Sequence, residues 1–295
     1  MRHIKLNPNV SCVGNFYIYG TGLIAKRVAY HFNDAYTLKG YIETKPEKKD
    51  FLGKAVFFPD ILLSDRDWDF CIIASAASSE IRGYLLGIGV PDKKIVCIWD
   101  EKNNISAIDD RLAFLRTVAE DLSDKGIKGS VAEVGVYKGS FSRHINAEFP
   151  DSKFYLFDTF DGFDQRDVDF DLAHGFDEEG IKKNNLAFDD IDYVLNRMPY
   201  RDRCVLKKGF FPETAQGIED RFVFVSLDVD MYQPIYEGLR YFWPRMEVGG
   251  CIVVHDYASP HWPGVKQAVR EFSDCEKAAF IPLSDLCGSA VFVKS

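Results

Sequence analysis

The sequence lacks the features of several large protein classes. It has no surplus of positive charge, because 36 Lys and Arg stand against 45 Asp and Glu, a formal net charge of −9. Proteins that bind nucleic acid or acidic membranes usually present a basic face, so neither partner is expected. No hydrophobic run approaches the roughly 18 residues that a membrane-spanning helix needs. The N-terminus, MRHIKLNPNV, also lacks the apolar stretch of a secretory signal.

Paired cysteines are missing as well. The seven cysteines are an odd number and form no CxxC pair. Several of them, such as Cys71 and Cys251, lie inside apolar runs that resemble buried strands. This usage is typical of reduced thiols, and it predicts a cytoplasmic protein with neither a disulfide framework nor a zinc knuckle.

The chain does contain enough apolar material for two domains. Its 295 residues are 46% hydrophobic and 14% aromatic, which excludes disorder as the overall state. By count, residues 1–100 carry 13 basic and 11 acidic groups, whereas residues 101–295 carry 23 and 34. A polar stretch, DEKNNIS, lies between the two parts. We predict a small Rossmann-like α/β module over 1–102 and a second domain over 103–295.

The second domain alternates strand-like and helix-like segments, which predicts a parallel sheet with helices on its faces. Its last two strands are joined by too few residues for a parallel crossover, so that pair should be antiparallel. A helix is expected to begin near Tyr232 and to be closed by Gly249-Gly250. We therefore predict an α/β fold with a seven-stranded sheet and one reversed strand. The predicted strands are 131–136, 153–158, 204–209, 221–228, 251–256, AAFIPL and SAVFVKS.

Two motifs at strand ends indicate a nucleoside-containing cofactor. In EVGVYKGSFS, Gly135 and Gly139 bracket a turn that lets the backbone approach a ligand, and the following helix points its N–H groups toward an anion. The next strand ends at Asp158, which is suited to accept hydrogen bonds from both ribose hydroxyls. The alternatives are a tight connection at the glycines and a helix-capping role for the aspartate.

Further cofactor contacts are expected around these motifs. Glu133 and Ser140 belong to the glycine motif, and Gly209 and Phe210 close the third strand, near the expected place of the adenine ring. Asp228, at the end of the fourth strand, is expected to lie beside the cofactor too. The loop ASPHWPG offers an aromatic and an imidazole side chain for stacking on a sugar, although packing explains the tryptophan equally well.

A second group of polar residues indicates a metal ion. Asp228 ends one predicted strand, and His255 and Asp256 end the next, so these side chains should converge if the strands are neighbours. Two carboxylates from adjacent strand ends repel each other unless a cation or a shared proton separates them. Mg²⁺ fits this demand best, with Mn²⁺ as the alternative, whereas zinc lacks a second His or Cys. Asp230 lies two residues beyond Asp228, in the following loop. It could reach a substrate hydroxyl, or could cap the helix near Tyr232.

These motifs together resemble the macrocin-type sugar O-methyltransferases, the TylF family. The resemblance covers residues 105–295 and is carried by EVGVYKGSFS, FDTFDGF, SLDVDMYQPIYEGLRYFWPRMEVGGCIVVHDY and WPGVKQAV. It implies a seven-stranded Rossmann-like class I methyltransferase fold, S-adenosylmethionine as cofactor, and methyl transfer to a sugar hydroxyl with divalent-metal help. By motif position Asp228, His255 and Asp256 match the metal ligands and Asp230 a general base. The family usually has two aspartates where this chain has His255-Asp256, so the histidine is a ligand, a neighbour of the ligands or a second candidate base.

The substrate is expected to be a small sugar-containing acceptor: a nucleotide sugar, a polysaccharide precursor or a glycosylated natural product. Residues 159–203 form a long connection, and residues 160–192 within it carry eleven acidic groups against three basic ones. This segment is predicted to be a lid or an acceptor-recognition loop, or else a solvated surface segment. Assembly of the chain into a homo-oligomer is also compatible with the sequence.

The first module permits a rival interpretation. GTGLIA, residues 20–25, matches the start of a dinucleotide fingerprint, and Glu43 falls where a ribose partner is expected. The alternative function is therefore an NAD-dependent oxidoreductase or epimerase that modifies nucleotide sugars. No YxxxK or comparable hydride-transfer apparatus accompanies the motif, and a scaffold role for this module is as well supported by its fold.

Overall fold

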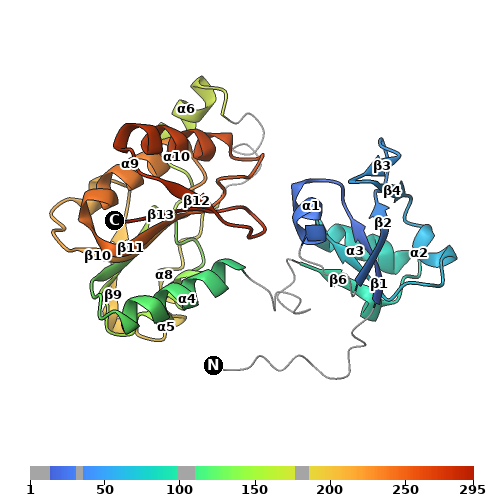
Figure 1. Ribbon diagram of the computed structural model, residues 1–295, viewed down its shortest axis with the longest axis horizontal. Coiled ribbons are helices and arrows are strands. Elements are labelled where there is room, and N and C mark those ends of the chain that lie inside the picture. The colour runs from blue at the N-terminus through green and yellow to red at the C-terminus, as the bar shows by residue number, and fades with distance from the viewer. Residues whose placement is uncertain (1–13, 31–35, 99–109, 177–185) are drawn as a thin grey trace. The chain divides into compact units, whose positions relative to one another are not determined.

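The computed structural model describes residues 14–30, 36–98, 110–176 and 186–295, and its contacts divide the chain into two compact units, 1–109 and 110–295 (Figure 1). The domain boundary predicted at residue 102 falls within 99–109, outside the described residues. Each unit has its own sheet and its own hydrophobic core. Among the described residues, no helix has the length and apolar character needed to cross a membrane.

The first unit is an α/β module around a six-stranded sheet with the order β3-β4-β2-β1-β5-β6. Strands β1, β2, β5 and β6 pair in parallel. Gly20 follows β1 with φ of +119°, and a Cβ there would lie 2.9 Å from the carbonyl oxygen of Ala74, so the turn requires glycine. The elements are β1 (Gly14–Tyr19), α1 (Leu23–Tyr30), β2 (Tyr36–Ile42), β3 (Asp50–Phe51), β4 (Lys54–Phe57), α2 (Ile61–Ser64), β5 (Phe70–Ile73), α3 (Ser78–Gly87) and β6 (Ile95–Cys97).

The second unit holds a seven-stranded sheet with the order β12-β13-β11-β10-β7-β8-β9. Strand β13 runs antiparallel to both of its neighbours, and the pairings among β7 to β11 are parallel, so the prediction of one reversed strand is confirmed. The strands are β7 (Ser130–Val134), β8 (Phe154–Asp158), β9 (Cys204–Lys208), β10 (Phe222–Leu227), β11 (Met246–Val254), β12 (Phe280–Pro282) and β13 (Ala290–Val293).

Helices cover both faces of this sheet (Figure 1). On one face α9 and α10 bury Ile235, Leu239 and Val265 in one apolar cluster, and on the other face α4, α5 and α8 bury Leu115 and Ile145 in a second cluster. Burial on both faces is why the central strands are almost entirely apolar. The helices are α4 (Asp110–Asp124), α5 (Ser142–Glu148), α6 (Gln165–Ala173), α8 (Ile191–Asn196), α9 (Tyr232–Phe242) and α10 (Pro263–Glu276).

Two predicted boundaries around Gly249-Gly250 are wrong. The strand predicted over 251–256 begins at Met246 and ends at Val254. Helix α9 begins at Tyr232 as expected, but it ends at Phe242 and not at Gly249-Gly250. Pro244 lies in the short 3-10 turn that follows. It has no N–H group to donate within the helix, so the α-helix does not continue through it. Both glycines lie inside β11, where its register with β10 shifts. A Cβ at Gly250 would lie 2.8 Å from the carbonyl oxygen of Val223, so glycine permits the close approach of the two strands.

Candidate active site

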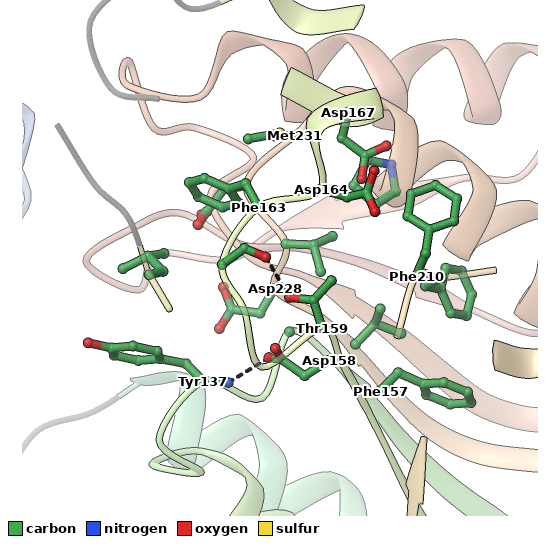
Figure 2. A pocket seen from close by; sticks show the side chains of 18 of the residues that line it. Tyr137, Phe157, Asp158, Thr159, Phe163, Asp164, Asp167, Phe210, Asp228 and Met231 are labelled. Atoms are coloured by element: carbon green, nitrogen blue, oxygen red, sulfur yellow. Dashed lines mark hydrogen bonds between the residues drawn. The ribbon is translucent and has the colours of Figure 1, made fainter. Parts of the chain in front are cut away.

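A cleft opens at the carboxyl ends of the central strands of the second unit (Figure 2). The chain passes from β7 to β8 on one side and returns to β10 on the other, so the connections that follow β7 and β10 diverge at this edge. The cleft has about 660 Å³ of space including its open mouth. Its lining includes six of the predicted site residues: Gly135, Asp158, Gly209, Phe210, Asp228 and Asp230.

Gly135 is required where β7 and β10 meet. Its φ is +88°, and a Cβ on this residue would overlap the carbonyl oxygen of Asp228. The neighbouring backbone is closely tied, since the amide of Asp228 donates to the carbonyl of Val134 at 2.8 Å and that of Gly135 to Phe157 at 2.9 Å. The glycine therefore brings the floor of the cleft next to Asp228.

Asp158 reaches the cleft from the end of β8, but its carboxylate is largely engaged. Its Oδ2 accepts hydrogen bonds from the amides of Tyr137 at 2.8 Å (Figure 2) and Val136 at 2.7 Å. Its Oδ1 accepts one from Phe160 at 2.7 Å. A carboxylate has about four acceptor positions, so one remains at Oδ1. In this conformation Asp158 fixes the turn after β7. Its binding of the ribose hydroxyls stays a prediction.

Phe210 forms an aromatic wall of the cleft, directly after Gly209. The guanidinium carbon of Arg166, on α6, lies 3.5 Å from the centre of the Phe210 ring. Arg166 also pairs with Asp164 at 2.8 Å and with Glu213 at 2.9 Å. These ion pairs and the stacking contact hold the first turn of α6 against the loop that carries Phe210.

Three predicted cofactor residues, Glu133, Gly139 and Ser140, are not among the residues that line the cleft. Glu133 is 2% exposed within β7, accepts a hydrogen bond from Ser142, and has its pKa raised by burial to about 8. Gly139 packs against α8, since a Cβ there would lie 3.0 Å from Val194 Cγ1. Ser140 is exposed. The motif thus shapes the turn, and of its residues singled out in the sequence only Gly135 lines the cleft.

Three aspartates gather beside the cleft, where β10 and β11 end. Asp228, Asp230 and Asp256 each offer an oxygen within 4.8 Å of those of the other two. Asp230 and Asp256 adopt left-handed φ values of 63° and 56°, a conformation that costs free energy for residues other than glycine and is often retained at functional sites. The structure thus brings together the carboxylates that the sequence placed at neighbouring strand ends.

His255 lies between two of these aspartates and does not line the cleft. Its Nδ1 is 2.9 Å from Asp228 Oδ1 and 2.9 Å from Asp256 Oδ2. Burial opposes the charged imidazolium, but the charges of Asp228 and Asp256 outweigh it and raise the pKa of His255 well above its ordinary value. Through Nδ1 the ring contacts both carboxylates, and its role as a second candidate base stays a prediction.

Arg111 is a site residue that sequence reasoning missed. It lies at the start of α4, is 9% exposed, and donates from its two terminal nitrogens to Asp228 Oδ2 and Ser226 Oγ, each at 2.9 Å. Its guanidinium carbon stacks 3.8 Å from the centre of the Phe141 ring. The contact with Asp228 joins positions 117 residues apart, so the pattern of α4 alone offers no signal for it.

The charges around the cluster favour different protonation states. Burial opposes ionisation of Asp228, but His255 and Arg111 hold its pKa well below the usual range. Burial, with the nearby charges of Asp256 and Asp228, raises the pKa of Asp230 well above its usual range. The same surroundings therefore oppose the ionisation of all three carboxylates together. Three carboxylates this close carry more negative charge than the neighbouring side chains balance. Their oxygens fit a hard divalent cation.

The acidic connection contributes to the wall of the cleft. Asp164 and Asp167, at the start of α6, both line it (Figure 2), and burial together with Asp164 and Asp171 raises the pKa of Asp167 to about 7. Residues 177–185 of the predicted lid are outside the described residues. Trp262 packs against Phe163 with ring centres 5.8 Å apart and is 9% exposed, so it belongs to the core and is not available for stacking on a sugar.

Comparison with known proteins assigns the second unit. The profile of macrocin-O-methyltransferases (TylF) matches residues 105–294. The chain belongs to this family. Among its relatives, the 8-demethyl-8-(2,3-dimethoxy-alpha-L-rhamnosyl)-tetracenomycin-C 4'-O-methyltransferase of Streptomyces olivaceus is 25% identical over 194 residues, which are 62% of this chain and 72% of that protein. The mycinamicin III 3''-O-methyltransferase of Micromonospora griseorubida is 27% identical over 177 residues, 56% of this chain and 68% of that protein.

Solved structures show the same fold. The calicheamicin methyltransferase CalS11 superposes with a TM-score of 0.52 at 20% identity, covering 73% of this chain and 91% of that one. Family membership makes this chain an S-adenosylmethionine-dependent O-methyltransferase. The alternative of an NAD-dependent oxidoreductase or epimerase has no support from these relatives. In the first unit, Thr21 donates a hydrogen bond to Glu43 at 2.8 Å, so the carboxylate predicted to bind ribose already has a partner.

Proposed function

We propose that this methyltransferase acts on a sugar hydroxyl, with a divalent cation held by Asp228 and Asp256 and with Asp230, the third carboxylate of the cluster, as the general base beside it. The observation that carries the proposal is the convergence of these three carboxylates beside the cofactor cleft. The names of the two relatives support the acceptor class, because one specifies a rhamnosyl-bearing substrate and both are O-methyltransferases of complex natural products. A glycosylated natural product is therefore the acceptor we favour among the three classes.

The cleft suits S-adenosylmethionine. Gly135 lets the ligand approach the backbone closely, Asp158 Oδ1 has one acceptor position left for a ribose hydroxyl, and Phe210 offers a flat apolar wall for the adenine ring. Acidic side chains along the lining favour the positive charge of a sulfonium. When bound, the cofactor supplies an electrophilic methyl group, whose bond to sulfur breaks as the bond to the acceptor oxygen forms.

The carboxylate cluster suits Mg²⁺, with Mn²⁺ as the alternative, because its donors are oxygens. When bound, such an ion lowers the pKa of a coordinated hydroxyl and fixes its orientation. We assign His255 to the support of the ligands, since its Nδ1 contacts both Asp228 and Asp256. Arg111 holds the second oxygen of Asp228 from the other side.

Asp230 is the proposed general base. It follows β10 and lines the cleft two residues beyond Asp228, so its carboxylate can face the acceptor hydroxyl. Burial and the two neighbouring aspartates raise the pKa of Asp230, and a cation bound beside it would oppose that effect.

The test measures release of S-adenosylhomocysteine with a panel of nucleotide sugars and glycosylated natural products, with and without Mg²⁺ after chelation. Asp230→Asn should lower turnover by at least about a hundredfold, the usual contribution of a general base, while the Kd for S-adenosylmethionine changes little. Asp274→Asn, at an exposed position of α10, is the matched control and should retain full turnover. Normal turnover in the Asp230 variant would exclude this assignment, and metal-independent turnover would exclude the cation.

A further inference from the structure

Cys287 lies next to the carboxylate cluster although nothing in the proposed reaction uses it. It belongs to the connection between β12 and β13, and one ligand atom from each of His255, Asp256 and Cys287 lies within 4.8 Å of those from the other two. Within the described parts of the chain, Cys287 is the cysteine that joins such a group of metal-binding side chains. The group is half-buried and mixed in donor type, with nitrogen, oxygen and sulfur.

The position of Cys287 is fixed by the hydrogen bonds of its loop. Asp285 is 4% exposed and accepts hydrogen bonds from the amide and the hydroxyl of Ser289, at 2.7 and 3.0 Å. The carbonyl of Gly288 accepts one from the amide of Ala258 at 2.9 Å, which ties the loop to the segment that follows Asp256. The thiol is therefore held beside the end of β11 by backbone contacts on both sides.

We propose that His255, Asp256 and Cys287 form a binding site for a thiophilic divalent cation such as Zn²⁺. Zinc binds sulfur at about 2.3 Å, imidazole nitrogen at about 2.0–2.1 Å and carboxylate oxygen at about 2.0–2.2 Å. The three ligand atoms lie within 4.8 Å of one another. Side-chain movements on the order of one ångström would therefore place all three at these distances from a single zinc ion. Water completes a tetrahedron. Mg²⁺ prefers oxygen donors, so the sulfur and nitrogen make this set selective against it.

This second set competes with the carboxylate cluster because both contain Asp256. Coordination also releases the thiol proton to solvent, since a thiol binds a metal ion in its deprotonated form. The second set in addition takes up His255, whose Nδ1 lies 2.9 Å from both Asp228 and Asp256. Zinc is therefore an inhibitor of methyl transfer. That consequence rests on the proposed function, whereas binding of the cation does not.

Cobalt absorption tests the site without any assay of activity. The full-length protein is kept reduced by a phosphine and titrated with Co²⁺. Three proteins are compared: the wild type, Cys287→Ser and Cys275→Ser. Cys275→Ser is the matched control, because Cys275 lies at an exposed position of α10. Wild type and Cys275→Ser should show sulfur-to-cobalt charge-transfer absorption. Cys287→Ser should lose it and bind Co²⁺ at least about tenfold more weakly, the minimum cost of losing even an outer-shell partner. Absence of charge transfer in the wild type, or equal affinity in Cys287→Ser, would overturn the proposal.

Zinc inhibition tests the competition. With saturating Mg²⁺, Cys287→Ser should keep the basal rate of the wild type and require at least about tenfold more Zn²⁺ for half inhibition. Equal inhibition of both proteins would refute the link between the two sites. If no acceptor is found and the proposed function fails, the cobalt titration still decides whether the cation site exists.

Discussion

Gly135 is the single residue at which the cleft should tolerate substitution least. Gly135→Ala introduces a Cβ into the carbonyl oxygen of Asp228 and places alanine at φ of +88°. The clash should separate β7 from β10 and cost about 2–4 kcal/mol in unfolding free energy, the sum of overpacking and left-handed strain. Chemical denaturation measures this loss, and titration calorimetry should show that the Kd for S-adenosylmethionine rises with it.

Gly126→Ala separates the two causes. Gly126 also has a positive φ, of 67°, but a Cβ there meets no atom within 4 Å. Its substitution carries strain without a clash and should cost about 1 kcal/mol, with no change in cofactor affinity. If the two variants lose equal stability, the contact with Asp228 is not the cause at Gly135.

Glu133 should make the stability of the protein depend on pH. Burial raises its pKa in the folded state from 4.5 to about 8. Because the folded pKa is the higher one, its contribution to stability is complete below about pH 4.5 and is lost as the pH rises to about 8. Glu133→Gln cannot ionise, so its unfolding free energy should fall less over this range, by on the order of 3–5 kcal/mol.

Urea denaturation at several pH values measures that difference, with Glu276→Gln as the control at an exposed position on α10. The control should follow the wild-type pH profile. Parallel profiles for wild type and Glu133→Gln would show that Glu133 is ionised in the folded protein, contrary to the effect expected from its burial.

At the scale of elements, α6 should help to hold the cofactor through one side chain. Arg166→Ala removes the guanidinium that lies 3.5 Å from the Phe210 ring and is paired with Asp164 and Glu213. Without these contacts the Phe210 ring is less ordered, so the Kd for S-adenosylmethionine should rise by about two- to fivefold while kcat stays unchanged. That rise corresponds to the free energy typical of an exposed cation–π contact.

Arg203→Ala is the comparison, because Arg203 is an exposed arginine whose nearest acidic partner, Asp202, is 3.6 Å away and outside the cleft lining. Its Kd for the cofactor should equal that of the wild type. A wild-type Kd for Arg166→Ala would mean that α6 is held in place by its other contacts.

The elements that the sequence predicted well are those encoded by local patterns. Apolar runs ending at Asp158 and Asp228 marked β8 and β10 to within a residue or two, and the parallel sheet then brought both ends to one edge. The reversed strand followed from the shortness of one connection, which excludes a crossover. Period and loop length are properties of neighbouring residues, so they can be read without the fold.

What the sequence could not predict depends on contacts between distant segments. Arg111 reaches Asp228 only because α4 packs beside β10, and Gly139 is small because α8 covers it. Gly249-Gly250 resembled the end of a helix, yet the pair serves the close approach of β11 to β10. Cys287 looked like another buried thiol until the β12–β13 connection placed it beside His255. None of these neighbours is adjacent in sequence.

At the scale of the whole molecule, the two units have separate hydrophobic cores. The core around Tyr17, Ile73 and Leu85 draws only on residues of the first unit, and the two clusters on either side of the second sheet draw only on the second. A core is the source of cooperative unfolding, so we expect two calorimetric transitions. S-adenosylmethionine at about a hundred times its Kd should raise only one of them, by roughly 5–10 °C.

Two glycine substitutions assign the transitions independently of the cofactor. Gly83 is exposed within α3 of the first unit, and a Cβ there meets no atom within 4 Å, so Gly83→Ala should stabilise that unit by about 0.5–1 kcal/mol through better helix propensity. Gly126→Ala should lower the other transition, the one that the cofactor raises. If instead one transition responds to both substitutions, the two cores unfold as one cooperative body, and the cofactor bound in the second unit would then stabilise the first unit as well.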